Sequence, residues 1–301
     1  MAFQELKEKD FAIKFLAKQL IKGNLTLFLG AGTSKGFGLP NWLELVNALR
    51  VRSGLDQLDE ATSAEDLQRG ADDVLDELKD NQKLINQIGD ILYEDKEDLD
   101  VKLAYENHLL IAISSLMIGS KRGHVSNVIT LNYDSMLEWY LQLYGFMVNS
   151  IYEIPSLEGS EDVRIYHPHG YIPHSSISSK SSDFVILGLH DANKRLGNPS
   201  DPWFEKTRAL LESSTCLFIG LSGQTLSDRV IAPLLASTGE KLKDKRPLGI
   251  WISKEELSGS KIKEFERNNI YPVVIQDVYD ITEFILKISQ EAMKMTLETV
   301  K

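Results

Sequence analysis

Short apolar runs separated by helix-patterned segments constrain the fold of this chain more than any other feature of its sequence. Runs of four to six residues with strand character occur at residues 25–29, 127–132, 163–166, 184–187, 215–219, 248–252 and 271–275. Strands that alternate with helices along a chain form parallel sheets that are covered by helices on both faces. The sequence therefore predicts an α/β fold with a doubly wound, mostly parallel sheet.

The segment between the first two runs has a different pattern. Residues 51–120 carry helical periodicity without strand signals, and acidic residues are dense between residues 56 and 100. We interpret this segment as a helical insertion within a single domain that spans residues 1–301. The acidic run has the composition of a solvated helix face. With 301 residues and 43% hydrophobic content, the chain can bury one large core.

Glycine and polar residues follow four of the predicted strands. They are Gly30 to Ser34 after the first run, Asn132 and Asp134 at the second, His169 and Gly170 after the third, and Gly220 to Ser222 after residues 215–219. Ligands of doubly wound sheets bind outside the carboxyl ends of the strands, so we expect these segments to meet. The first glycine turn suits a phosphate group, because glycine lets backbone N–H groups approach a ligand closely. Its spacing is not the full Gly-x-Gly-x-x-Gly fingerprint, and a tight turn without a ligand is the alternative.

In this order, the four segments resemble those of the sirtuin-like superfamily. Residues 30–34 resemble the Gly-Ala-Gly-x-Ser phosphate loop, and residues 130–134 resemble the Thr-Gln-Asn-Ile-Asp segment beside the nicotinamide ribose. His169-Gly170 is similar to the catalytic His-Gly pair, and residues 220–222 resemble the late Gly-Thr-Ser loop. The resemblance implies a Rossmann-like, sirtuin-type domain that binds NAD, with catalytic roles for Asn132 and His169, and with cofactor-binding roles for Gly30, Ala31, Gly32, Thr33, Ser34, Asp134, Gly220 and Ser222.

The chain also departs from the protein deacylase sirtuins. Residues 38–42 read Gly-Leu-Pro-Asn-Trp where deacylases carry Gly-Ile-Pro-Asp-Phe-Arg, and Cys216 is the single cysteine, so the four-cysteine zinc ribbon is missing. With its long helical segment, the chain looks like the bacterial sirtuin-like NAD hydrolases of anti-phage defence, some of which pair with a HerA-type ATPase. That resemblance implies cleavage of NAD to nicotinamide and ADP-ribose, and depletion of the cell's NAD.

Each candidate residue also has an ordinary structural interpretation. Asn132 is a residue type that forms turns, His169 can cap its own turn, and Asp134, Thr33 and Ser34 can cap helices. Given NAD as substrate, His169 suits a general base, because imidazole titrates near physiological pH. Asn132 suits a residue that orients water or the ribose. His167, two residues before His169, is predicted to be a supporting residue. The histidines and the single cysteine have no metal-ligand spacing, so we predict no metal.

The charge and the hydrophobic pattern of the chain limit the kinds of partner that it can bind. The net charge is −11, and no basic tract offers a footprint for nucleic acid. Neither a membrane-spanning apolar run nor a secretory signal is visible, which predicts a cytoplasmic protein. The sequence after the sheet suggests no sensor domain, so we expect control in trans, through a homo-oligomer or a partner such as a HerA-type ATPase. Two other functions stay open: an NAD-dependent protein deacylase, and a non-enzymatic module that senses NAD or ADP-ribose.

Overall fold

A seven-stranded parallel sheet forms the centre of the computed structural model, which describes residues 3–59, 62–94, 96, 99–118, 123–157, 159–222, 225 and 231–300. The strands of this described part are β1 (Leu25–Leu29), β2 (Asn127–Thr130), β3 (Val148–Ile151), β4 (Val163–Tyr166), β5 (Thr215–Ile219), β6 (Gly249–Ser253) and β7 (Ile270–Val274). Their order is β3-β4-β2-β1-β5-β6-β7, and every neighbouring pair is parallel. The predicted doubly wound parallel sheet is confirmed.

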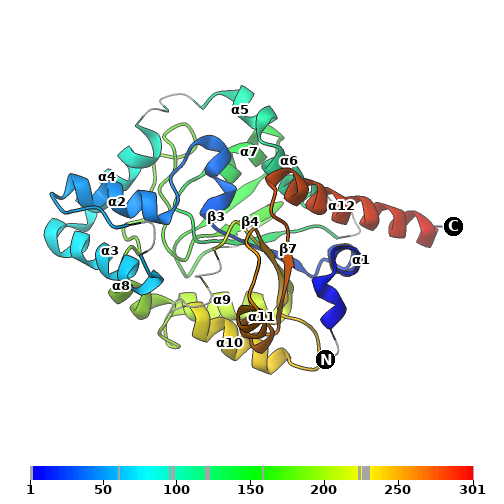
Figure 1. Ribbon diagram of the computed structural model, residues 1–301. Helices are drawn as coiled ribbons and strands as arrows, with labels where there is room; N and C mark the ends of the chain where they lie inside the picture. The colour runs from blue at the N-terminus through cyan, green and yellow to red at the C-terminus, as the bar shows by residue number, and fades with distance from the viewer. Residues whose placement is uncertain are drawn as a thin grey trace.

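The sheet separates two hydrophobic cores, because successive side chains of a strand point to opposite faces. In β1, Leu27 packs into the core beneath α1 (Lys9–Ile21), α6 (His108–Ser115), α7 (Met136–Leu143) and α12 (Val278–Val300). Phe28 packs into the core on the other face, beneath α8 (Leu189–Arg195), α9 (Pro202–Ser213), α10 (Ile231–Leu242) and α11 (Gly259–Arg267). The result is a three-layer α/β/α arrangement (Figure 1).

The segment between β1 and β2 is helical and divides into two parts. The helices α2 (Trp42–Arg52), α3 (Ala64–Leu78) and α4 (Asn81–Tyr93) bury a separate cluster that includes Leu49, Val74 and Ile88. They lie together at one side of the sheet (Figure 1). By contrast, Ala104 of α5 (Val101–Glu106) and Ile113 of α6 pack into the main core. Only the first part therefore has a core of its own.

Side-chain caps define several helix starts. Asn41 forms a capping box with Glu44 at α2, with backbone N–H groups donating to side-chain oxygens in both directions. The Ser63 hydroxyl and the Asp201 carboxylate accept from backbone N–H groups at the starts of α3 and α9. Asn, Ser and Asp are residue types favoured at helix N-caps, so the sequence itself predicts helix starts at these three positions. The sequence predicts a further helix start at Ser227 by the same reasoning, and that position lies outside the described residues.

The structure corrects several local predictions. Residues 184–187 are not a strand; they lie beside the turn at His169, where the Ile186 N–H donates to the His169 carbonyl. The edge strand β3 and helix α8 were not predicted, because neither has a clear apolar periodicity in its sequence. The amphipathic pattern of residues 3–21 predicts one helix, but the helix is interrupted at Glu8, so that η1 (Gln4–Lys7) precedes α1. The sequence likewise predicts one helix over residues 103–118, but a break at Asn107 separates α5 from α6.

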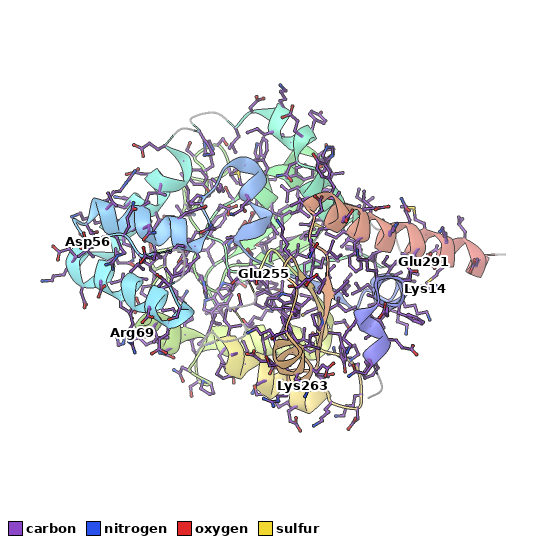
Figure 2. The ribbon with its side chains drawn as sticks, viewed as in Figure 1. Lys14, Asp56, Arg69, Glu255, Lys263 and Glu291 are labelled. Carbon is purple, nitrogen blue, oxygen red and sulfur yellow. The ribbon has the colours of Figure 1, made fainter. Side chains whose placement is uncertain are left out.

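Charged side chains cover the outer helices, as Lys14, Arg69 and Lys263 show on α1, α3 and α11 (Figure 2). The C-terminal half of α12 extends past the rest of the fold (Figure 1), where Met293 and Leu297 are exposed. None of the helices in the described part of the chain is long and apolar enough to cross a membrane.

Candidate active site

The four segments singled out from the sequence follow four adjacent strands of the sheet, in the order β4, β2, β1 and β5. Because these strands are parallel, their carboxyl ends lie at one edge. The chain runs outward from β1 to β2 in one direction and returns to β5 on the other side. Such a reversal of strand order is where doubly wound sheets bind ligands. The topology therefore brings the predicted residues to one place.

The loop after β1 packs directly on the loop after β5. The Gly32 N–H donates to the Gly220 carbonyl at 2.9 Å, and the Gly30 N–H donates to the Ile219 carbonyl at 3.0 Å. A Cβ atom on Gly32 would lie 2.8 Å from the Gly220 Cα, and one on Gly220 would lie 2.7 Å from the Thr33 nitrogen. Gly220 also has a φ of +71°, which favours glycine. These glycines are needed for the close approach of two backbones.

Asn132 joins the end of β2 to the same loop. Its amide nitrogen lies 3.3 Å from the Gly30 carbonyl, 3.3 Å from Thr33 Oγ1 and 3.1 Å from Ser34 Oγ. Its backbone N–H donates to the Thr130 hydroxyl. Among the described residues, the side-chain oxygen of Asn132 has no hydrogen-bond partner. That oxygen is available to a ligand or to water.

The hydroxyls of Thr33 and Ser34 are buried and have partners inside the protein. Thr33 Oγ1 donates to the Gly30 carbonyl at 2.8 Å, and Ser34 hydrogen-bonds to the Asp134 carboxyl. In contrast, the Ala31 N–H has no backbone partner within the described part of the chain, and Ser222 is exposed. Ala31 and Ser222 are therefore the loop residues best placed to donate to an anion.

Asp134 is a buried acid at this edge. Burial is the main cause that raises its pKa to about 6, and hydrogen bonds from the Met136 N–H and from Ser34 oppose the rise. The carboxyl therefore changes protonation state close to neutral pH.

His169 follows β4 and is partly buried. Burial, and then the positive charge of Arg195, lower its pKa to about 4, so that the imidazole is neutral at physiological pH. Arg195 donates to the Pro168 carbonyl at 3.3 Å and stacks over the Phe184 ring. Gly170, with a φ of +108°, turns the chain immediately afterwards. Within the described residues, the His169 ring has no hydrogen-bond partner, so its nitrogens can meet a substrate.

His167 lies deeper and has partners on both ring nitrogens. Nε2 is 2.7 Å from Glu138 Oε1, and Nδ1 is 3.1 Å from the Asn132 carbonyl oxygen. Both His167 and Glu138 are fully buried. Sequence reasoning missed Glu138, although a lone acid between Leu137 and Trp139 in an apolar helix was a usable signal.

No group of three or more His, Cys, Asp or Glu residues is placed to hold a metal ion in the part of the chain that the structure describes.

Comparisons with known proteins agree with the fold. A family model for the SIR2-like domain matches residues 126–273, which include β2 to β6 and most of β7. The chain is 26% identical, over 96% of its length, to a protein named NAD(+) hydrolase ThsA from Bacillus cereus (strain MSX-D12). It is 25% identical, again over 96% of its length, to a protein of the same name from Enterococcus faecium. It spans 58% and 60% of the lengths of these relatives.

Proposed function

We propose that this chain, which carries a SIR2-like domain and is distantly homologous to NAD(+) hydrolases, cleaves the bond between nicotinamide and ribose in NAD. One observation carries the proposal: the glycine loop, Asn132 and His169 occupy the carboxyl ends of three adjacent strands. NAD is the substrate in this proposal, and no metal takes part.

The dinucleotide would lie along the strand ends. The loop of Gly30, Ala31 and Gly32 would hold the pyrophosphate, with the Ala31 N–H as donor. Gly220 and Ser222 would contact the adenosine half. The hydroxyls of Thr33 and Ser34 form hydrogen bonds inside the protein. We therefore propose that these two residues support binding by fixing the shape of the loop. Asp134 would accept from the nicotinamide carboxamide.

The chemistry needs little assistance at the leaving group. Nicotinamide in NAD⁺ is cationic, so the glycosidic bond breaks with both electrons going to the pyridine nitrogen, and the ribose C1′ gains oxocarbenium character. Water then bonds to C1′ and loses a proton. The neutral His169 imidazole accepts that proton, and the Asn132 side-chain oxygen orients the water. The products are nicotinamide, ADP-ribose and one proton.

The low pKa of His169 suits a residue that accepts a proton from water after the glycosidic bond has broken. A neutral imidazole can accept a proton, whereas an imidazolium would repel the cationic transition state. The anionic pyrophosphate of bound NAD would raise the pKa of His169 towards the working pH, because a nearby negative charge favours the protonated ring. Substrate binding would thus strengthen the base.

In the cell, we propose that this activity depletes NAD during phage infection and is controlled by a homo-oligomer or a HerA-type ATPase partner. This part of the proposal rests on the resemblance to sirtuin-like defence hydrolases. Cells that carry the wild-type gene should then restrict phage growth and lose NAD after infection, whereas cells with His169→Ala should do neither.

The direct test is incubation of the pure protein with NAD⁺, followed by chromatography for nicotinamide and ADP-ribose in equal amounts. The assay is run with and without phage-infected lysate, because control in trans predicts that activation is required. Deacylation of an acyl-lysine peptide would favour a deacylase. Tight NAD binding by calorimetry without any product would favour the sensing module.

A further inference from the structure

Glu138 and His167 form a buried pair that the proposed chemistry does not use. Their side chains are 1% and 0% exposed, and Nε2 of the imidazole lies 2.7 Å from Glu138 Oε1. Glu138 sits on α7, where it is one of six successive buried residues. Titratable groups are costly to bury, so such a pair needs a compensating role.

The neighbours of the pair determine where its protons lie. The Asn132 carbonyl oxygen can only accept, so His167 Nδ1, 3.1 Å away, must carry a hydrogen and donate to it. The other ring nitrogen, Nε2, forms a hydrogen bond with the Glu138 carboxyl group. The Ser150 hydroxyl donates to the same Glu138 oxygen at 3.3 Å, and the Tyr171 ring packs on the imidazole with centroids 4.6 Å apart. The imidazole is held from three sides.

The ring therefore connects the two catalytic candidates. Through Nδ1 it holds the main chain of Asn132, at the end of β2. The backbone of His167 leads directly to His169, which lies two residues further along the chain. Its backbone N–H donates to the Ile151 carbonyl, which ties this point to β3 as well. A change in the ring would alter where Asn132 stands relative to His169.

We propose that His167 and Glu138 are positioning residues: Glu138 orients the His167 ring, and His167 holds the Asn132 peptide in register with His169. The proposal rests on the proposed NAD cleavage for its catalytic consequence, but its structural consequence is independent of any activity. Both side chains are buried away from the surface of the site, so the pair should act on turnover more than on affinity.

Two substitutions at His167 separate the roles of its nitrogens. In His167→Asn, the amide nitrogen takes the place of Nδ1, which keeps the donor to Asn132 and loses the contact with Glu138. In His167→Gln, the amide reaches Glu138 and the donor to Asn132 is lost. We expect kcat to fall about 10- to 100-fold in His167→Gln, with KM for NAD⁺ nearly unchanged, because small displacements of reacting groups cost this much. His167→Asn should recover most of the loss.

Thermal stability should follow the opposite order, because His167→Asn leaves Glu138 buried without its partner. This reversal excludes a merely structural role, for which kcat and stability would fall together. A kcat for His167→Gln equal to that of the wild type, or variants whose kcat simply follows stability, would overturn the proposal.

A readout without substrate distinguishes failure of this inference from failure of the proposed function. Hydrogen exchange of the amides of residues 131–134 should quicken in His167→Gln and stay near wild type in His167→Asn. If the wild type does not cleave NAD⁺, this comparison still decides the positioning role. If the His167 variants do not fold, Glu138→Gln and Glu138→Leu replace them. Glu138→Gln should keep slow exchange and Glu138→Leu should lose it; equal exchange in both would refute the inference.

Discussion

The side-chain nitrogen of Asn132 lies 3.1 Å from the hydroxyl oxygen of Ser34. The two residues are 98 positions apart in the sequence, and this contact joins the end of β2 to the loop after β1. Ser34 in turn hydrogen-bonds to Asp134, which also follows β2, so the loop after β1 is linked to the segment after β2 by two contacts. The proposed catalytic amide and the proposed phosphate loop therefore form one connected unit.

Replacing Asn132 by Ala should abolish most of the NAD cleavage. The variant loses both the oxygen that orients the water and the nitrogen that binds the loop, so we expect a loss in kcat/KM of about 100-fold or more. Asn86→Ala, at an exposed position on α4, is the matched control and should have wild-type rates. Wild-type turnover by a folded Asn132→Ala would remove Asn132 from the site.

Arg195→Gln should raise the pKa of His169. Burial keeps the pKa low in any case, but the variant removes the positive charge that lowers it further. Protonation abolishes a base, so activity is present above the pKa of His169 and lost below it. The acidic limb of kcat/KM should therefore move to higher pH in the variant.

The pKa itself is measured by following the His169 ring protons in an NMR titration. Arg69→Gln, at an exposed position on α3, is the control and should leave the titration unchanged. A pKa of His169 that does not rise in Arg195→Gln would contradict the assigned cause.

Asp134→Asn should stabilise the protein above pH 6. The pKa of Asp134 is about 6 in the folded chain against an ordinary value of 3.8. A group with a raised folded pKa contributes stability that is fully present below the unfolded pKa and is lost as pH rises through the folded pKa. Asn carries no charge at any pH, so the variant should gain about 1–3 kcal/mol at pH 8.

Urea unfolding at pH 8 and at pH 5 measures this effect. The gain should shrink at pH 5, where the buried carboxyl is mostly protonated in the wild type. Asp76→Asn, at an exposed position on α3, is the control for the replacement of a carboxylate by an amide. An equal difference at both pH values would show that Asp134 is not the titrating group.

Gly220→Ala should destabilise the protein more than Gly54→Ala. Both glycines have positive φ values, +71° and +76°, so both variants incur a backbone cost of about 1–2 kcal/mol. The Cβ atom added at position 220 would lie 2.7 Å from the Thr33 nitrogen, whereas nothing lies within 4 Å of a Cβ atom added at position 54. Equal free energies of unfolding for the two variants would contradict the close approach of the two loops.

The meeting of the four segments at one edge of the sheet could be predicted because its signals are local. A buried strand that runs into a glycine turn, as at Leu29 and Gly30, is visible in ten consecutive residues, and parallel strands bring such turns together. The order of the strands explains why Asn132 and the glycine loop meet.

The features that the sequence did not predict depend on contacts between distant residues, or lie in segments without a distinctive pattern. The partnership of Glu138 with His167 joins positions 29 apart and follows from no spacing rule. Strand β3 reads Val-Asn-Ser-Ile, an edge strand without an apolar run. Residues 184–187 are apolar because Val185 and Leu187 pack on the cluster of α2 to α4, not because they join the sheet.

The most direct test of the central claim compares nicotinamide release from NAD⁺ by the wild type, His169→Ala and His108→Ala. His108 is exposed on α6 and serves as the control histidine. All three proteins are assayed alone and with phage-infected lysate, after circular dichroism has shown that they are folded. We predict release by the wild type and by His108→Ala, and none by His169→Ala. Equal release by His169→Ala, or none by the folded wild type under either condition, would contradict the account.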